Sequence, residues 1–137
     1  MSEAPPSPLP RRKAVWHWLP VLLWVGVMQY FSSAPNPYAA IGQGTTTSDF
    51  LGHLCGFALL AALVLRWLRF RMEEQGMRAA AYTLALCLVY AVFDELHQIP
   101  IPGRSFEWLD LLTDAMGSGA AVGAALAWQA LRRRARA

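Results

Sequence analysis

Two pairs of ionisable side chains in this sequence have the spacing that places both members on one face of a helix. Asp49 and His53 are four residues apart, and so are Asp110 and Asp114. Residues three or four positions apart are neighbours on a helix surface. A carboxylate beside an imidazole or a second carboxylate can move a proton or hold a cation. These pairs are therefore candidates for chemistry.

A third polar group lies between the two pairs in the sequence. Asp94 and Gln98 share a helix face, Glu95 is three residues before Gln98, and Arg104 follows in a segment rich in proline. A guanidinium group can hold a carboxylate or a phosphate in a bidentate fork. If three helices bring these faces together, the sequence predicts one pocket that combines carboxylates, an imidazole and a cation.

Two uses of such a pocket stay open. In an enzyme, Glu95 or Asp94 is the general base, His53 shuttles a proton and Arg104 clamps a phosphate or carboxylate. In a non-enzymatic protein, the polar cluster ties helices together and the protein binds an envelope component or a partner protein. Asp, Glu and His also suit Mg²⁺, Mn²⁺ or Zn²⁺, although no ligand spacing here is diagnostic of a metal. The candidate catalytic residues are Asp94, Glu95, His53 and Asp110, and the candidate substrate-binding residues are Arg104, Gln98, Asp49 and Asp114.

Simpler roles are open to some of these residues. Asp49 has the position of a helix N-cap, and Asp110 that of a first-turn acid favoured by the helix dipole. Asp114 lies more than one turn inside its apolar run and His53 lies one turn inside, so a solvated surface role explains neither well.

Four apolar runs carry these residues and must position them. Of the 137 residues, 55% are hydrophobic and 15% are charged, whereas about 25% are charged in a soluble domain. The runs are roughly 17 to 23 residues long, which fits membrane-spanning helices. Residues 54–65 leave no polar face, which disfavours a soluble bundle. We therefore predict an all-α, polytopic membrane protein with four transmembrane helices arranged as two hairpins, over residues 15–31, 50–68, 79–96 and about 109–131.

The first run could instead belong to a signal peptide, because a basic segment precedes it and small residues follow it. Pro35 directly after Ser32-Ser33-Ala34 disfavours cleavage there. We therefore expect a retained membrane anchor.

The basic residues indicate the orientation in the membrane. Eleven of the twelve Lys and Arg residues fall on one side if the chain crosses four times, and Arg104 is the exception. The positive-inside rule places that side in the cytoplasm, with both termini, and the loops 33–48 and 97–108 face outward. This distribution accounts for the net charge of +3 without nucleic acid as a partner. The predicted organisation is a disordered cytoplasmic tail (1–14), a four-helix membrane domain (15–131) and a basic cytoplasmic tail (132–137).

Small residues predict where helices approach closely. Gly52-x-x-x-Gly56 and Gly119-x-x-x-Gly123 both have the GxxxG spacing. Packing of the second run against the fourth through these glycines would bring His53 toward Asp114.

Taken together, these motifs resemble the signature of VanZ-like membrane proteins, and the resemblance runs from Trp16 through nearly the whole chain. It implies a multi-pass membrane protein of a family whose founding member is linked to resistance against the glycopeptide teicoplanin, without implying a known reaction. The motifs are Phe31-Ser32-Ser33, Asp49-x-x-x-His53, Asp94-Glu95-x-x-Gln98, Pro102-Gly103-Arg104 and Asp110-x-x-x-Asp114-x-x-Gly117.

The chain departs from the family pattern at two positions. Phe50 stands where the family often has Lys, and Asp114 stands where it usually has Asn. Both changes make the site more acidic and favour a cation or a protonated acid in it. We expect a site at the outer ends of the second to fourth helices that binds or modifies a membrane lipid or a cell-envelope precursor in the cell membrane.

Overall fold

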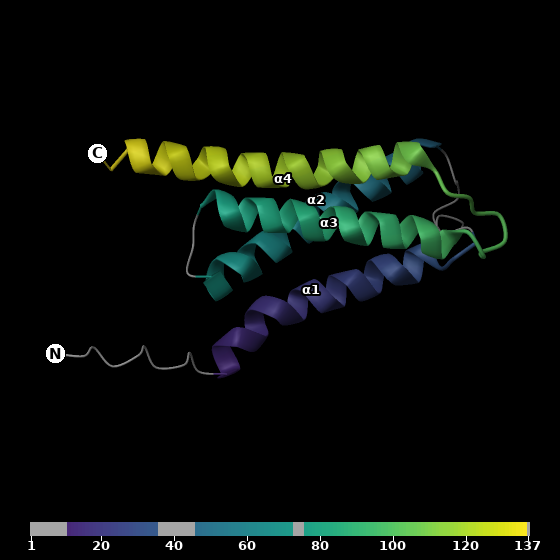
Figure 1. Ribbon diagram of the computed structural model, residues 1–137, viewed down its shortest axis with the longest axis horizontal. Coiled ribbons are helices and arrows are strands. Elements are labelled where there is room, and N and C mark those ends of the chain that lie inside the picture. The colour runs from purple at the N-terminus through teal and green to yellow at the C-terminus, as the bar shows by residue number, and fades with distance from the viewer. Residues whose placement is uncertain (1–10, 36–45, 73–75, 137) are drawn as a thin grey trace.

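The computed structural model describes residues 11–35, 46–72 and 76–136 (Figure 1). Within these residues the chain forms four helices and no strand, which confirms the predicted all-α class. The helices are α1 (Arg11–Ser32), α2 (Thr46–Met72), α3 (Met77–Gln98) and α4 (Trp108–Arg134).

Each helix extends beyond the apolar run that predicted it. α1 begins at Arg11, and α4 continues to Arg134. Arg, Lys and Ala are strong helix formers, so the basic residues beside the runs continue the helices. Parts of the expected tails, 1–14 and 132–137, are therefore helical. Residues 1–10 lie outside the described part of the chain.

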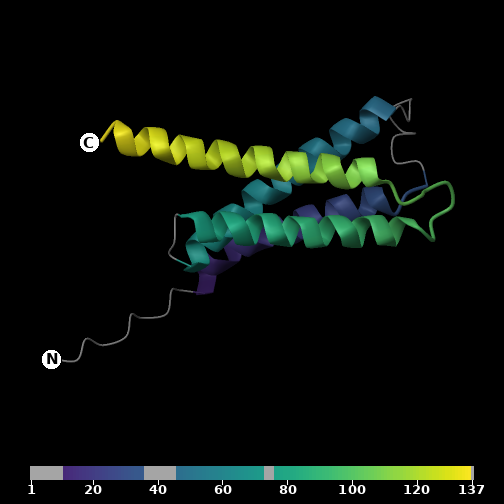
Figure 2. The same ribbon diagram turned by 45° about the horizontal axis from the view of Figure 1, so that its top comes forward.

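The helices lie along one another, and α2 connects the other three. Figure 1 shows the start of α1 and the end of α4 at one end of the molecule, and the segment between α3 and α4 at the other. α2 contacts each of the other helices, most extensively α4, which it crosses at an inclination (Figure 2). The first turns of α2 thus meet the end of α3 and the start of α4 at the same end of the bundle. We call this the polar end.

Apolar packing fills the rest of the bundle. Phe57, Leu60, Ala61, Val64 and Leu65 of α2 are buried there against small residues of α3 such as Ala80. The buried polar side chains, in contrast, include Asp94, Glu95, Gln98, Thr113, Asp114 and Ser118, which come from the last turns of α3 and the first half of α4.

The outer surface carries large apolar side chains, as a lipid-facing surface does. On α3, Val89 is 70% exposed and Phe93 is 55% exposed, and on α1 Leu22 and Leu23 are similarly exposed. Monomeric soluble proteins seldom expose contiguous apolar surface on this scale. With charged groups inside and aliphatic groups outside, the bundle has the polarity of a membrane protein.

Among the residues that the structure describes, two helices are long and apolar enough to cross a membrane, over Ser48–Met72 and Met77–Gln98. The other two are less apolar for identifiable reasons. α1 contains His17, Pro20 and Gln29, and α4 contains two aspartates and a series of glycine, serine and alanine residues. Length and composition therefore support a membrane protein and identify α2 and α3 as candidate spans.

Candidate functional site

The polar end is built on a close contact between α2 and α4. Gly117 lies against the backbone of α2. A Cβ atom at this position would overlap the carbonyl oxygen of Leu54 and lie 3.2 Å from the nitrogen of Ala58. The absence of a side chain at Gly117 therefore allows the two helices to meet one turn from Asp114.

This contact corrects the packing predicted from the GxxxG patterns. A Cβ atom added at Gly119 or Gly123 would have no atom within 4 Å, and one added at Gly56 would lie 3.6 Å from Met28 Cε of α1, not against α4. α2 and α4 do pack tightly, but through Gly117. The physical reason is helical phase, because Gly117 shares the inward face of Asp110 and Asp114 whereas Gly119 and Gly123 do not.

Four side chains from three helices form what we call the acidic cluster: His53, Glu95, Asp110 and Asp114. His53 Nδ1 lies 2.9 Å from Asp114 Oδ1, and His53 Nε2 lies 3.5 Å from Asp110 Oδ2. Asp114 is completely buried, whereas His53 and Asp110 are nearly so. The imidazole thus joins α2 to two successive turns of α4.

Glu95 completes the cluster from α3. Its side chain is 0% exposed, and its Oε2 accepts a hydrogen bond of 2.8 Å from the backbone N–H of Glu107, which precedes α4. His53, Glu95 and Asp110 each offer one atom that could ligate a metal, and these three atoms lie within 4.8 Å of one another. These three residues could hold a metal ion.

The connection between α3 and α4 carries Arg104 over the same end of the bundle. Two prolines, which lack an N–H, prevent a regular helix after Gln98. Gly103 has φ of 81°, a left-handed conformation that glycine adopts at no steric cost. The turn is closed by hydrogen bonds from Ile101 N to Gln98 O (2.9 Å) and from Arg104 N to Ile101 O (3.0 Å).

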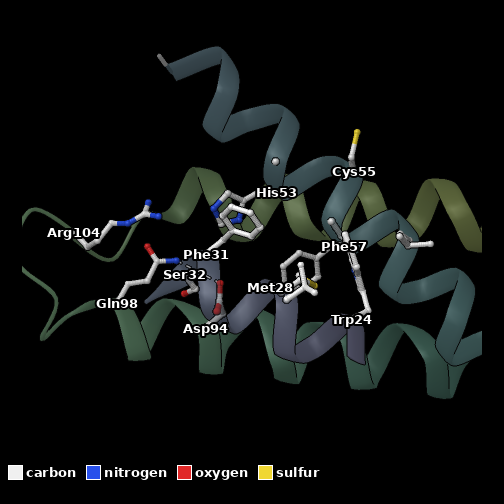
Figure 3. A pocket seen from close by; sticks show the side chains of 14 residues that line it. Trp24, Met28, Phe31, Ser32, His53, Cys55, Phe57, Asp94, Gln98 and Arg104 are labelled. Atoms are coloured by element: carbon white, nitrogen blue, oxygen red, sulfur yellow. Dashed lines mark hydrogen bonds between the residues drawn. The ribbon is translucent and has the colours of Figure 1, made fainter. Parts of the chain in front are cut away.

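A pocket of about 370 Å³ opens beside the acidic cluster, between α1, α2, α3 and the Arg104 segment (Figure 3). Its polar end contains His53, Asp94, Gln98, Arg104 and Ser32. Its other walls are apolar and come from α1 and α2: Trp24, Val27, Met28, Phe31, Gly52, Cys55, Gly56, Phe57 and Leu59. The pocket is therefore amphiphilic, with a charged end and a longer hydrocarbon-like part.

Trp24 fixes the apolar part of the pocket, because its indole Nε1 donates a hydrogen bond of 2.9 Å to the carbonyl oxygen of Gly56. This bond joins α1 to α2. At the polar end, Ser33 Oγ lies 3.0 Å from His97 Nε2 and joins α1 to α3. The pocket is thus a gap between helices that hydrogen bonds hold at both ends.

Polar atoms in the pocket have unused hydrogen-bonding capacity. Asp94 is 4% exposed, and its Oδ2 lies 3.4 Å from Gln98 Nε2, while its Oδ1 has no partner within the described chain. Ser32 Oγ is also buried without a described partner. Arg104 Nε makes one long hydrogen bond of 3.4 Å to Ala34 O, and no described carboxylate lies within 4 Å of its guanidinium group. Buried polar groups usually have partners, so these atoms are available to a polar ligand.

The structure therefore divides the predicted site into two adjacent parts. Asp94, Gln98 and Arg104 line the pocket, and His53 belongs to both the pocket and the acidic cluster. Glu95, Asp110 and Asp114 belong to the cluster alone, behind His53.

Asp49 joins neither part. It lies in the first turn of α2, and no hydrogen bond or ion pair connects it to the other site residues that the structure describes. Because α2 begins at Thr46, Asp49 is not the N-cap that its place in the sequence suggested; it is a first-turn acid, which the helix dipole favours.

Some residues that shape the site were not among the candidates. Ser32 was named only as part of a family motif, and Trp24 was not singled out at all, because a tryptophan inside an apolar run resembles any other apolar residue there. The backbone N–H of Glu107 gave no signal in the sequence, because any residue type supplies the same donor.

A profile of the VanZ/LLP1 family matches residues 17–131. The chain therefore belongs to the VanZ/LLP1 family, which confirms the resemblance seen in its motifs. No curated protein and no solved structure matches the chain.

Proposed function

We propose that this protein binds a phosphate-bearing amphiphile, a membrane lipid or a lipid-linked cell-envelope precursor, in the pocket beside the acidic cluster. The observation that carries the proposal is the amphiphilic lining of that pocket. Its polar end offers Arg104, Asp94 and Ser32 without full complements of partners, and its remaining walls are apolar. An acyl chain fits the apolar part and a polar head group fits the charged end.

The side chains at the polar end of the pocket indicate which head groups would bind there. Arg104 is suited to a phosphate or carboxylate, which a guanidinium holds with two parallel hydrogen bonds. Asp94 Oδ1 and Ser32 Oγ can accept hydrogen bonds from a hydroxyl or an amine. The preferred ligand thus combines an anionic group with a nearby hydroxyl or amine. In any reaction on such a ligand, His53 and Asp94 face the head group, whereas Glu95 and Asp110 act through His53.

The proposal includes four membrane spans with both termini in the cytoplasm. Two observations support this topology. The outer faces of α1 and α3 are apolar and exposed, and the start of α1 and the end of α4 lie at the same end of the bundle (Figure 1). Eleven of the twelve Lys and Arg residues lie toward that end. The pocket then opens near the outer leaflet of the cell membrane, where cell-envelope precursors are presented.

Membership of the family leads us to include a link to teicoplanin in this proposal. A protein that binds an outer-leaflet envelope component can change how much of that component a glycopeptide reaches. We expect overproduction of the wild-type chain to lower the sensitivity of host cells to teicoplanin, and Arg104→Gln to abolish that effect at equal membrane abundance.

Lipid retention by the purified protein tests the binding itself. Native mass spectrometry in detergent should show retained phosphatidylglycerol and little retained diacylglycerol with the same chains. Arg104→Gln should lower phosphatidylglycerol retention by about tenfold, as expected for loss of one charged hydrogen-bonded contact. Arg134→Gln, an exposed arginine at the other end of the bundle, is the matched control and should change nothing. Equal retention by the two variants would refute the proposal.

A structural scaffold is the second candidate, and the buried pair of His53 and Asp114 favours it. This pair joins α2 to α4 within the membrane domain, and cutting such a pair is strongly destabilising whether or not the protein has a ligand. A scaffold predicts that Asp114→Leu reduces the amount of folded protein and that Arg104→Gln, which loses one long hydrogen bond, changes neither abundance nor lipid retention. For Arg104→Gln the binding proposal predicts normal abundance with loss of lipid retention, so the two candidates differ in lipid retention alone.

A further inference from the structure

The acidic cluster has an imbalance of charge. Glu95, Asp110 and Asp114 surround one imidazole, and no Lys or Arg that the structure describes lies within 4 Å of any of them. Residues 36–45, which lie outside the described part of the chain, contain no charged side chain. Carboxylates brought together out of water need a cation or a proton to coexist.

A second observation indicates where a cation belongs. Glu95 is 0% exposed, and although its Oε2 accepts the N–H of Glu107, its Oε1 has no hydrogen-bond partner in the described chain. A buried carboxylate oxygen without a partner costs free energy unless something coordinates it. The same carboxyl group provides an atom within 4.8 Å of donor atoms of His53 and Asp110.

We propose that His53 Nε2, Asp110 and Glu95 form a binding site for one divalent transition-metal ion. His53 Nε2 and Asp110 Oδ2 are 3.5 Å apart. Two ligands at about 2.1 Å from a tetrahedral ion lie roughly 3.4 Å apart, so this pair already has the required separation. Rotation of the Glu95 carboxyl group, whose Oε1 is uncommitted, brings in the third ligand.

Asp114 orients the imidazole for this role. It contacts His53 Nδ1 at 2.9 Å and is completely buried, so it fixes the ring with Nε2 toward Asp110. Metal-bound histidines usually donate their second ring N–H to a carboxylate or carbonyl in this manner. Asp114 is thus a positioning residue that acts through His53.

The donor set selects the class of ion. One imidazole with two carboxylates suits Zn²⁺ or Mn²⁺ better than Ca²⁺ or Mg²⁺, which prefer oxygen ligands alone. Three protein ligands leave a coordination position for water or for a ligand oxygen. Because His53 also lines the pocket, a cation bound here would lie next to the lipid head group, and to that extent the metal site rests on the proposed function. Binding of the cation itself does not require the lipid.

Equilibrium dialysis of the full-length protein in detergent tests this site. The protein is first stripped with a chelator and delipidated, and then titrated separately with Zn²⁺ and Mn²⁺, with the bound metal measured by elemental analysis. We expect one Zn²⁺ per chain with a Kd of about 1 μM or below. Asp110→Asn and Glu95→Gln should each weaken binding by at least about tenfold, and Asp114→Asn by about 10–100-fold.

Asp49→Asn is the matched control, because it removes an acid from the same end of the bundle that lies outside the cluster. Its Kd should stay within about threefold of the wild-type value, because Asp49 provides no ligand atom and acts on Asp110 only through a longer-range Coulombic interaction. Melting of each variant without metal shows that it is folded. If Glu95→Gln does not fold, Asp110→Asn, whose side chain is partly accessible, is decisive.

Two results overturn the metal site. The first is that folded wild-type protein shows no saturable binding at free Zn²⁺ or Mn²⁺ concentrations up to about 100 μM, a range that covers ordinary protein metal sites. The other is binding that Asp110→Asn leaves unchanged. The lipid-retention experiment on chelator-treated protein separates the two proposals, because retention without metal keeps the proposed function while the metal site is refuted.

Discussion

Replacing Gly117 with alanine tests whether the contact between α2 and α4 holds the site together. The added Cβ would overlap the carbonyl oxygen of Leu54, and it would lie 3.1 Å from the carbonyl carbon of Leu54 and 3.2 Å from the nitrogen of Ala58. All three are backbone atoms of a helix, so no side-chain rotation relieves the overlap. The helices must separate at this point.

The size of the effect follows from the distances. Ordinary contacts between heavy atoms begin at about 3.5 Å, so the helices must move apart by roughly 1 Å. The 2.9 Å contact between His53 and Asp114 lies one turn away and lengthens with that movement. Overpacking costs about 1–3 kcal/mol and a weakened charged hydrogen bond about 1.5–3 kcal/mol. These costs sum to about 2.5–6 kcal/mol, and alanine favours a helix over glycine by about 1 kcal/mol, so the free energy of unfolding should fall by about 1.5–5 kcal/mol.

Gly119→Ala is the matched control for this substitution. It adds the same methyl group to the same helix, where nothing lies within 4 Å, and alanine favours a helix by about 1 kcal/mol over glycine. Thermal melting in detergent should place Gly117→Ala roughly 5–17 °C below the wild type and Gly119→Ala at or above it. A melting temperature for Gly117→Ala equal to that of Gly119→Ala would show that the close contact is absent.

Three further outcomes are expected. Asp114→Asn keeps a hydrogen bond to His53 and should lower the melting temperature only slightly. Asp114→Leu leaves His53 Nδ1 without its carboxylate partner and should cost about 3–5 kcal/mol; equal melting of the two variants would contradict the pair. Gly103→Val places a branched residue at φ of 81°, which costs about 1–2 kcal/mol of stability. It should also reduce lipid retention, because the strained turn displaces Arg104. Unchanged retention would show that the turn does not position Arg104. Cysteine labelling tests the orientation, in a chain whose Cys55 and Cys87 have first been replaced. A cysteine introduced as Ser105→Cys should react with an impermeant maleimide on intact cells, whereas one introduced as Arg136→Cys should react only after permeabilisation. The reverse pattern would contradict the predicted orientation.

The sequence predicts the helices and the cluster of polar residues well because both depend on local patterns. Apolar runs separated by proline and glycine determine the helices, and the spacing of His53, Asp110 and Asp114 determines a shared face. The approach of His53 to Asp114, expected from close packing of the second and fourth runs, was predicted correctly. The close contact is made by Gly117, however, and not by Gly119 or Gly123 of the GxxxG pattern.

The division between the pocket and the cluster could not be predicted. Asp94 and Glu95 are adjacent, so they differ by about 100° around the helix axis, and one faces the pocket while the other faces the cluster. Which faces which depends on the rotation of α3 against its neighbours, and that rotation is a tertiary property. The partner of Glu95 is a backbone N–H of Glu107, which no side-chain pattern reveals.

Photo-crosslinking tests the central claim, occupancy of the pocket by an amphiphile, most directly. A phospholipid with a photoactivatable acyl chain is incorporated with the wild-type protein, and the labelled peptides are mapped. We expect labels concentrated on residues 24–31 of α1 and 52–59 of α2, which carry the apolar lining, and a loss of that concentration in Arg104→Gln. Labelling spread over exposed apolar positions such as Val89 and Phe93, and unchanged in Arg104→Gln, would contradict it.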